Sequence, residues 1–257
     1  MNATPRSDDL TRDLYQDEYT HDFVNRWDEL INWKGRWESE GGFFQDLLRQ
    51  YGAVQVLDAA CGTGFHTVML ARDGFKTTGA DGSPEMVRKA KENAERAGIP
   101  DLPVVEAEWT SMSQSFPDQK FDAIMLLGNA FTHLFEEADR KKALDEFYKL
   151  LSDDGILIID HRNYDALMDK NYANRHQHYY LGEDVNAYPE ELGENFVRMR
   201  YEYGDGSSYH LTLCPIRQNY VTELMRDAGF QNIRRYGDFK AEYSFYDPDF
   251  IIQVGTK

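Results

Sequence analysis

The chain has 257 residues, 41% of them hydrophobic and 14% aromatic, which fits one large folded domain and excludes a disordered chain. With 28 basic and 45 acidic residues the net charge is −17, which argues against general binding to nucleic acid or to an anionic membrane. The polar start, the mean hydropathy of −0.66 and only two cysteines, Cys61 and Cys214, predict a cytoplasmic protein without a signal peptide or a membrane span.

The N-terminal part is predicted to be a tail followed by helices. Residues 1–18 are polar and are expected to form a flexible tail. In the aromatic stretch over residues 19–37, apolar side chains recur at helical spacing, namely Phe23, Trp27, Leu30 and Ile31. A second helix is predicted over residues 42–51.

From residue 54 onward, strands and helices alternate. Five strands are predicted, over residues 54–60, 76–81, 102–109, 121–129 and 155–163. A helix follows the glycine turn at the end of the first strand. Another begins after Ser83, with Pro84 at its first position, and a third runs from Ala138 to Leu151. This alternation predicts a parallel sheet with crossover helices.

After Asn163 the alternation stops. Residues 194–213 alternate polar and apolar side chains on both sides of a Gly-Asp-Gly turn, which predicts a β-hairpin. A helix at 216–228 and strands at 232–236 and 250–255 then return to the sheet. The predicted fold is α/β, a doubly wound seven-stranded sheet over residues 19–257, with a small antiparallel lid inserted at about residues 164–214.

The segment DAACGTG, residues 58–64, follows a strand and opens a helix, so it is a candidate nucleotide-binding turn. A dinucleotide site needs glycine at 60, 62 and 65, and only Gly62 fits. S-adenosylmethionine sites have an acid at the strand end and a looser glycine pattern, which Asp58, Gly62 and Gly64 match. A carboxylate at that position suits the ammonium group of the methionine moiety and would repel a pyrophosphate. The turn therefore favours S-adenosylmethionine over a nicotinamide dinucleotide.

Four further residues fit a nucleoside site. Asp81 ends the second strand, where an acid accepts hydrogen bonds from ribose hydroxyls in both nucleotide classes. Met86 lies on the first turn of the next helix and either covers an adenine or packs in the core. Glu108 and Trp109 follow the third strand and fit the edge and face of an adenine, although Trp109 is equally suited to cover the core.

Two residues at strand ends fit an amino-acid substrate. Arg162 lies just past the fifth strand, and its planar fork suits a carboxylate; the alternative is a structural salt bridge with Asp160 or Asp165. Asn129 ends the fourth strand and either offers its side-chain oxygen to an amine or is a turn residue. These strand ends meet at the edge where such sheets bind ligands.

No metal site is predicted. His176 and His178 have no cysteine or carboxylate at ligand spacing and fit a polar loop better. His133 is expected to be a structural hydrogen-bonding residue rather than a base. Serine hydrolase chemistry is also not indicated, because no nucleophile elbow is present.

Four segments together resemble the glycine N-methyltransferases, and most closely their bacterial glycine/sarcosine branch. They are DAACGTG (58–64), GNAFTHL (128–134), IDHRNYD (159–165) and GDFK (237–240). The resemblance covers nearly the whole chain from about Tyr19. It implies a Rossmann-like class I S-adenosylmethionine-dependent methyltransferase fold, with glycine and sarcosine as substrates in the opening steps of glycine betaine synthesis in halophiles. The acidic composition fits either an ordinary soluble enzyme or a salt-rich cytoplasm, and the resemblance adds weight to the second.

The resemblance also implies roles for individual residues. Those expected at the cofactor are Tyr19, Trp27, Arg36, Asp58, Ala60, Gly62, Asp81, Gly82, Met86, Glu108, Trp109 and Leu127. Those expected at the acceptor are Asn129, Arg162, Tyr179, Tyr180 and Tyr201. One departure is Leu213-Cys214-Pro215, where mammalian members have a tyrosine pair before the proline, so the far wall of the substrate pocket is expected to differ.

Three other functions remain open at this stage. One is methylation of another small amine, such as sarcosine or dimethylglycine alone. The second is a nicotinamide oxidoreductase, which the poor glycine fit disfavours. The third is a regulator that binds S-adenosylmethionine without turnover, which would leave Arg162 and Asn129 unexplained. The sequence does not indicate an oligomeric state.

Overall fold

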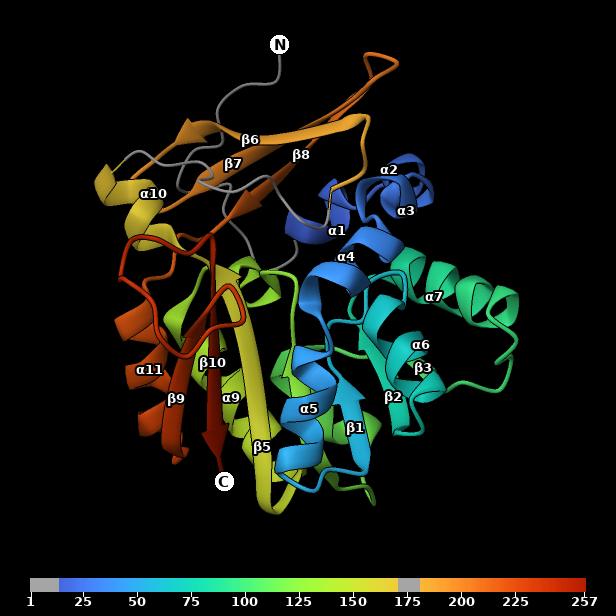
Figure 1. Ribbon diagram of the computed structural model, residues 1–257, viewed down its shortest axis with the longest axis vertical. Coiled ribbons are helices and arrows are strands. Elements are labelled where there is room, and N and C mark those ends of the chain that lie inside the picture. The colour runs from blue at the N-terminus through green and yellow to red at the C-terminus, as the bar shows by residue number, and fades with distance from the viewer. Residues whose placement is uncertain (1–13, 171–180) are drawn as a thin grey trace.

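A seven-stranded sheet forms the centre of the molecule (Figure 1). The computed structural model describes residues 14–170 and 181–257. The strands lie in the order β3-β2-β1-β4-β5-β10-β9; β1 to β5 are parallel, and β10 is antiparallel to both of its neighbours. Their bounds are β1 Gln55–Asp58, β2 Lys76–Asp81, β3 Val104–Glu106, β4 Phe121–Leu126, β5 Leu151–Arg162, β9 Gln231–Gly237 and β10 Phe250–Thr256. The predicted doubly wound sheet is confirmed.

Helices cover both faces of this sheet, because successive strand residues point to opposite sides. On one face, Phe44 and Leu70 share an apolar cluster with Val56 of β1. On the other face, Phe147 shares a cluster with Leu57, the next residue of the same strand. The helices around the sheet are α5 Phe43–Gln50, α6 Phe65–Arg72, α7 Pro84–Arg96, α8 Met112–Ser115, α9 Glu137–Leu150 and α11 Gln218–Asp227.

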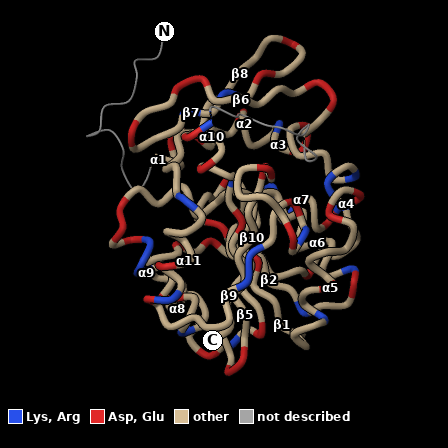
Figure 2. The backbone as a smooth tube through the Cα atoms, turned by 60° about the vertical axis from the view of Figure 1, so that its left-hand side comes forward, with Lys and Arg blue, Asp and Glu red and all other residues tan. Residues whose placement is uncertain are grey.

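A second layer lies over the carboxyl ends of the parallel strands (Figures 1 and 2). One part is a three-stranded antiparallel sheet, here called the lid, in the order β6-β7-β8. The other part, here called the N-terminal segment, comprises helices α1 to α4. The bounds are β6 Val185–Leu192, β7 Val197–Tyr203, β8 Ser208–Leu213, α1 Leu14–Glu18, α2 His21–Asn25, α3 Trp27–Leu30 and α4 Trp33–Glu40.

The N-terminal segment is tied to the lid at two points. The Glu18 carboxylate accepts hydrogen bonds from the backbone N–H (2.8 Å) and the hydroxyl (2.7 Å) of Thr212 on β8. The Arg26 guanidinium donates to Asp205 (2.8 Å) and to Ser207, and it lies 3.9 Å from the centre of the Tyr203 ring. Segments far apart in the sequence therefore form one covering layer.

The lid is larger than the predicted hairpin. The hairpin corresponds to β7 and β8, whereas β6 was not expected as a strand. Its sequence contains Pro189 and Glu191, residue types that are uncommon inside strands. The structure accommodates them with a register shift between these two residues, where β6 pairs with β7. The helix α10, Tyr164–Lys170, leads from β5.

Two other expectations need correction. The strand predicted over 102–109 is confined to Val104–Glu106, because the chain then turns into the 3₁₀ helix η2, Trp109–Ser111, and the indole N–H of Trp109 donates to the Ala59 carbonyl at 2.6 Å. The N-terminal stretch is helical but divided, since Asn32 accepts a hydrogen bond from the backbone of Gly35 and starts a new helix, α4.

Helix α1, Leu14–Glu18, lies inside the segment predicted as a tail. A second 3₁₀ helix, η3, spans Ala130–His133 after β4. Within the part of the chain that the structure describes, no helix combines the length and apolar character needed to cross a membrane.

Candidate active site

A cavity of about 1480 Å³, its open mouth included, lies between the carboxyl edge of the main sheet and the covering layer. The strand order reverses between β1 and β4, which is where sheets of this kind bind ligands. The cavity is lined by fourteen of the predicted site residues: Tyr19, Trp27, Arg36, Ala60, Gly62, Asp81, Gly82, Met86, Glu108, Trp109, Leu127, Asn129, Arg162 and Tyr201. Asp58 is not among its lining residues, and Tyr179 and Tyr180 lie outside the described residues.

The glycine turn closes tightly between β1 and α6. Gly62 (φ 52°) and Gly64 (φ 93°) adopt the left-handed backbone conformation, which residues other than glycine rarely adopt. A Cβ on Gly64 would lie 3.3 Å from that of Ala90, so glycine also lets α6 start close to α7. The backbone N–H of Gly62 donates to the Asp81 carboxylate at 2.9 Å. The turn thereby joins the ends of β1 and β2 at the cavity.

The Asp81 carboxylate is held from two sides. Besides Gly62, it accepts a hydrogen bond from the backbone N–H of Ser83 at 2.9 Å. Burial raises the pKa of Asp81 to about 6, although both backbone hydrogen bonds favour the charged form. This geometry presents a fixed acceptor at the place where the sequence predicts one for ribose hydroxyls.

Asp58 lies behind the turn and is almost fully buried. One carboxylate oxygen accepts a hydrogen bond from the Thr67 hydroxyl at 2.6 Å, and the other has no hydrogen-bond partner among the described residues. Burial raises its pKa, while His66 and Arg36 act in the opposite direction. An unpartnered buried oxygen costs free energy that a ligand donor, direct or through water, would offset.

A buried ionic cluster adjoins the turn and was not predicted as a unit. Glu40 accepts a hydrogen bond from Arg36 Nε at 2.8 Å and lies 3.0 and 3.1 Å from His66 Nε2. Arg36 and His66 line the cavity, and all three side chains are buried. Burial would raise the pKa of Glu40, but His66 and Arg36 lower it below its usual value. Glu40 therefore remains charged and holds both neighbours against the cavity wall.

The N-terminal segment covers one end of the cavity. The Tyr15 hydroxyl donates to Glu108 at 2.6 Å and lies 3.5 Å from the Gly82 carbonyl. Tyr19 contacts His133 through its hydroxyl, 3.1 Å from Nε2. Tyr15 was placed in the predicted tail; the only sequence signal for it is its spacing of four residues from Tyr19, which puts both rings on one helical face.

His133 lies beneath these two tyrosines. Its ring is buried, and burial lowers its pKa to about 4, so the imidazole is neutral at physiological pH. His176 and His178 lie outside the described residues, and elsewhere in the described chain no three His, Cys, Asp or Glu side chains are grouped to hold a metal ion.

The opposite end of the cavity is built by the loop after β4. Asn129 adopts φ 66°, and its backbone N–H donates to the Asp160 carboxylate at 2.7 Å. The Asn129 side chain accepts from the backbone N–H of Arg162 (2.9 Å) and donates to the Tyr164 hydroxyl (2.9 Å). The predicted acceptor residues Asn129 and Arg162 are thus brought together, and Asn129 also holds the backbone of Arg162 in place.

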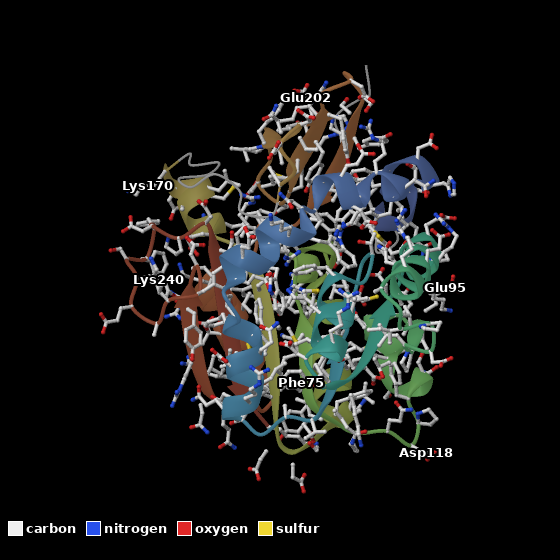
Figure 3. All side chains as sticks on the ribbon, turned by 45° about the vertical axis from the view of Figure 1, so that its right-hand side comes forward. Phe75, Glu95, Asp118, Lys170, Glu202 and Lys240 are labelled. Carbon is white, nitrogen blue, oxygen red and sulfur yellow. The ribbon has the colours of Figure 1, made fainter. Side chains whose placement is uncertain are left out.

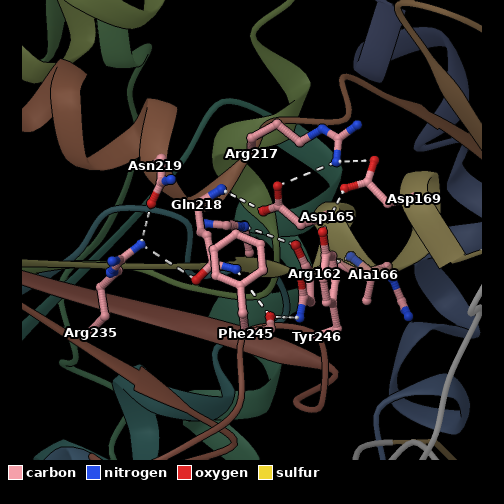
Figure 4. Close-up of polar contacts among 12 residues, drawn as sticks. Arg162, Asp165, Ala166, Asp169, Arg217, Gln218, Asn219, Arg235, Phe245 and Tyr246 are labelled. Atoms are coloured by element: carbon pink, nitrogen blue, oxygen red, sulfur yellow. Dashed lines mark hydrogen bonds and ion pairs between the residues drawn. The ribbon is translucent and has the colours of Figure 1, made fainter.

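Arg162 is 5% exposed and lines the cavity, with its guanidinium carbon 5.3 Å from the centre of the Phe250 ring. One alternative partner from the sequence, Asp165, is bound from another direction. Asp165 accepts from Arg217 at 3.3 Å and from the backbone N–H of Gln218 at 3.0 Å (Figure 4). This network connects the start of α10, which follows β5, to the start of α11.

The lid supplies the remaining wall. Tyr201 was predicted at the acceptor. Leu213 is part of the segment Leu213-Cys214-Pro215, in which the sequence departs from the family pattern. Met199 and Leu211 also line the cavity and were missed, because buried apolar residues on a strand carry no signal that separates a binding wall from a core.

Comparison with known proteins agrees with this geometry. The chain matches the methyltransferase domain family over residues 56–155. It is 47% identical to the glycine/sarcosine N-methyltransferase of Halorhodospira halochloris, over 100% of this chain and 98% of that protein. It is 49% identical to the enzyme of the same name from Aphanothece halophytica, over 95% and 92%. A solved S-adenosylmethionine-dependent methyltransferase from Clostridium acetobutylicum has the same fold, with a TM-score of 0.73 at 19% identity over 91% of this chain and 97% of that one.

Proposed function

The chain belongs to the glycine/sarcosine N-methyltransferase family, and on this premise we propose that it transfers methyl groups from S-adenosyl-L-methionine to the amines of glycine and sarcosine. The products are sarcosine and dimethylglycine, which fits the early steps of glycine betaine synthesis. One observation carries the proposal: the glycine turn with Asp81 and the Arg162–Asn129 pair line the same cavity. A nucleoside site and a carboxylate site that share one cavity are what transfer between two ligands requires.

The residues present fit the cofactor. Asp58 does not line the cavity, and its unpartnered oxygen would bind the ammonium group of the methionine moiety directly or through water. Asp81 would accept hydrogen bonds from the ribose hydroxyls, and Arg36 would pair with the methionine carboxylate. Met86, Glu108 and Trp109 would enclose the adenine. The other predicted cofactor residues along the wall would line the remainder of the cofactor; they are Tyr19, Trp27, Ala60, Gly62, Gly82 and Leu127.

The residues of the acceptor end fit glycine. The Arg162 guanidinium would bind the carboxylate through two parallel hydrogen bonds. Asn129 keeps Arg162 in place through its backbone, and Tyr201 would offer its hydroxyl to the amine. In this proposal Tyr179 and Tyr180, which the described part of the chain does not include, contribute to the same end.

When bound, S-adenosylmethionine would supply an electrophilic methyl group, with its sulfonium sulfur as the leaving group, to the lone pair of the acceptor amine. The protein need not create a strong nucleophile for this, since the neutral amine is one already. Its contribution is to hold the acceptor in line and to exclude water beneath the N-terminal segment and the lid. Positive charge grows on the nitrogen, and the Asp160 carboxylate in the cavity wall stabilises it.

We place the enzyme in the cytoplasm, because both cysteines are unpaired thiols, as a reducing compartment keeps them. Its substrates are small amino acids.

A methyl-transfer assay tests the proposed function. Purified protein is incubated with radiolabelled S-adenosylmethionine and, separately, with glycine, sarcosine, dimethylglycine and other amino acids, and each product is identified. Transfer to glycine and sarcosine is expected. Transfer only to other amines, or binding of the cofactor without transfer to any amine, would refute the proposal.

A further inference from the structure

The lid presents one apolar wall to the cavity. Met199 on β7 and Leu211 and Leu213 on β8 line the cavity, and each is at most 3% exposed. Met199 is paired with Leu211 across the two strands, and Leu213 lies two residues further along the same strand. Because strand residues alternate, all three side chains stand on one face of the lid. Tyr201, on the same face, is the lid side chain lining the cavity that has a hydroxyl.

This wall belongs to the acceptor end of the cavity. The backbone N–H of Cys214, next to Leu213, donates to the Thr132 carbonyl at 2.8 Å. The Thr132 hydroxyl donates to the Asn129 carbonyl at 2.6 Å, and the Asn129 side chain holds the backbone of Arg162. The end of β8 is therefore connected to the loop that positions Arg162.

The chemistry of this wall distinguishes the substituents of an amine. Leucine and methionine side chains offer no acceptor for an N–H hydrogen bond, so a primary amine gains nothing by facing them. A methyl group placed there leaves water, which is worth about fourfold in binding for a single carbon. The remaining N–H of a methylated acceptor would face the polar side chains at the acceptor end of the cavity.

We propose that Met199, Leu211 and Leu213 form the subsite for the N-substituent of an already methylated acceptor, and that the size of the side chain at position 213 decides how well sarcosine competes with glycine. The inference rests on the proposed function and adds the residues that decide its acceptor range. These three side chains take no part in the chemical step; they determine specificity.

The test changes the volume of the wall in both directions. In Leu213→Phe, the ratio of kcat/KM for sarcosine to that for glycine should fall by about tenfold or more, as one excess carbon in an apolar pocket commonly costs. In Leu213→Ala, the ratio of kcat/KM for N-ethylglycine to that for sarcosine should rise by a similar factor. The matched control is Leu224→Ala, which truncates a buried leucine of α11 that does not line the cavity and should leave both ratios within about twofold.

Calorimetric binding of S-adenosylmethionine checks that each variant is folded. If Leu213→Phe does not fold, Leu211→Phe on the same face must give the same fall in ratio. Folded variants with unchanged ratios overturn the subsite while the wild-type enzyme remains a glycine/sarcosine methyltransferase. A wild-type protein that methylates neither amino acid overturns the proposed function, and the subsite with it.

Discussion

Arg162 is a buried cation at the end of a strand, and its environment is organised to keep it there. Its backbone N–H is bound by Asn129, its guanidinium lies near the Phe250 ring, and Asp165, three residues further along, is bound by Arg217 and Gln218. A planar guanidinium held in this way at the cavity wall is suited to bind a substrate carboxylate through two parallel hydrogen bonds.

Arg162→Lys should lower kcat/KM for glycine by about 2–4 kcal/mol, roughly 30- to 1000-fold, because a point charge cannot reproduce two parallel hydrogen bonds. Steady-state kinetics measures the loss, and calorimetry should find cofactor affinity nearly unchanged. Glycinamide, which lacks the carboxylate, should be a poor substrate for the wild type and lose little more in the variant.

The matched control is Arg217→Lys, since Arg217 pairs with Asp165 and Asp169 and does not line the cavity. Its glycine kinetics should stay close to wild type. Equal losses for glycine and glycinamide in Arg162→Lys would show that Arg162 supports the structure and is not a carboxylate clamp.

Asp81 gives a prediction about pH. Its pKa of about 6 in the ligand-free protein means that it takes up a proton as the pH falls through 6, and a protonated carboxyl is a poorer acceptor for ribose hydroxyls. The dissociation constant of S-adenosylmethionine should therefore rise about tenfold from pH 7 to pH 5. In Asp81→Asn the affinity should be weaker at pH 7 but nearly flat over this range. The same pH dependence in both proteins, measured by calorimetry, would assign the titration to another group.

At the scale of the elements, the strand ends were predictable and the covering layer was so only in part, since the hairpin of β7 and β8 was predicted whereas β6 and α1 were not. Gly62, Asp81, Asn129 and Arg162 lie at or just after the carboxyl ends of buried strands, and parallel strands bring these ends to one edge, so the pattern alone places them together. Tyr15 reaches the cavity only because α1 packs beneath the lid. That contact depends on tertiary packing between distant segments, and local periodicity does not encode it.

The two ties between the N-terminal segment and the lid predict that these elements open together. Arg26→Ala removes the hydrogen bonds to Asp205 and Ser207 and the contact with Tyr203. Because Asp205 is largely exposed, we expect a cost of only about 1 kcal/mol, seen as roughly fivefold faster hydrogen exchange. Mass spectrometry should find the increase in α2 and in β7 and β8 alike.

Arg49→Ala is the control for this variant, since Arg49 on α5 pairs with Asp46 and Asp73, outside the covering layer. It should leave exchange in the lid unchanged. Faster exchange in α2 alone after Arg26→Ala would mean that the N-terminal segment and the lid move independently.

At the scale of the whole molecule, Asp and Glu positions are spread along the helices around the sheet and along the lid (Figure 2). A net charge of −17 on one chain of 257 residues disfavours the compact state through self-repulsion. Salt weakens this repulsion, because the Debye length falls from about 10 Å at about 0.1 M to about 3 Å at about 1 M.

The melting temperature should therefore rise with KCl. A rise of about 3–8 °C between about 0.1 and 1 M is expected, since each kcal/mol shifts Tm by about 2–4 °C in a chain of this size. Glu95 and Asp118 are exposed at the periphery (Figure 3). A Glu95→Gln/Asp118→Asn variant has a net charge of −15, and its melting temperature should rise slightly less over the same range of KCl. A Tm that falls steadily as KCl is added contradicts the expectation.

The tie between α1 and the lid also bears on the order in which the protein assembles. Glu18 and Thr212 are 194 residues apart in the chain, whereas β1 pairs with β2 beginning at Gln55 and Lys76. Contacts between such distant residues form late in folding. The sheet should therefore gain protection in pulse-labelled hydrogen exchange before α1 and β8 do, and simultaneous protection would contradict this order. A newly made chain would accordingly have its strand ends in place while its binding cavity is still open to water, and the cavity would be completed last.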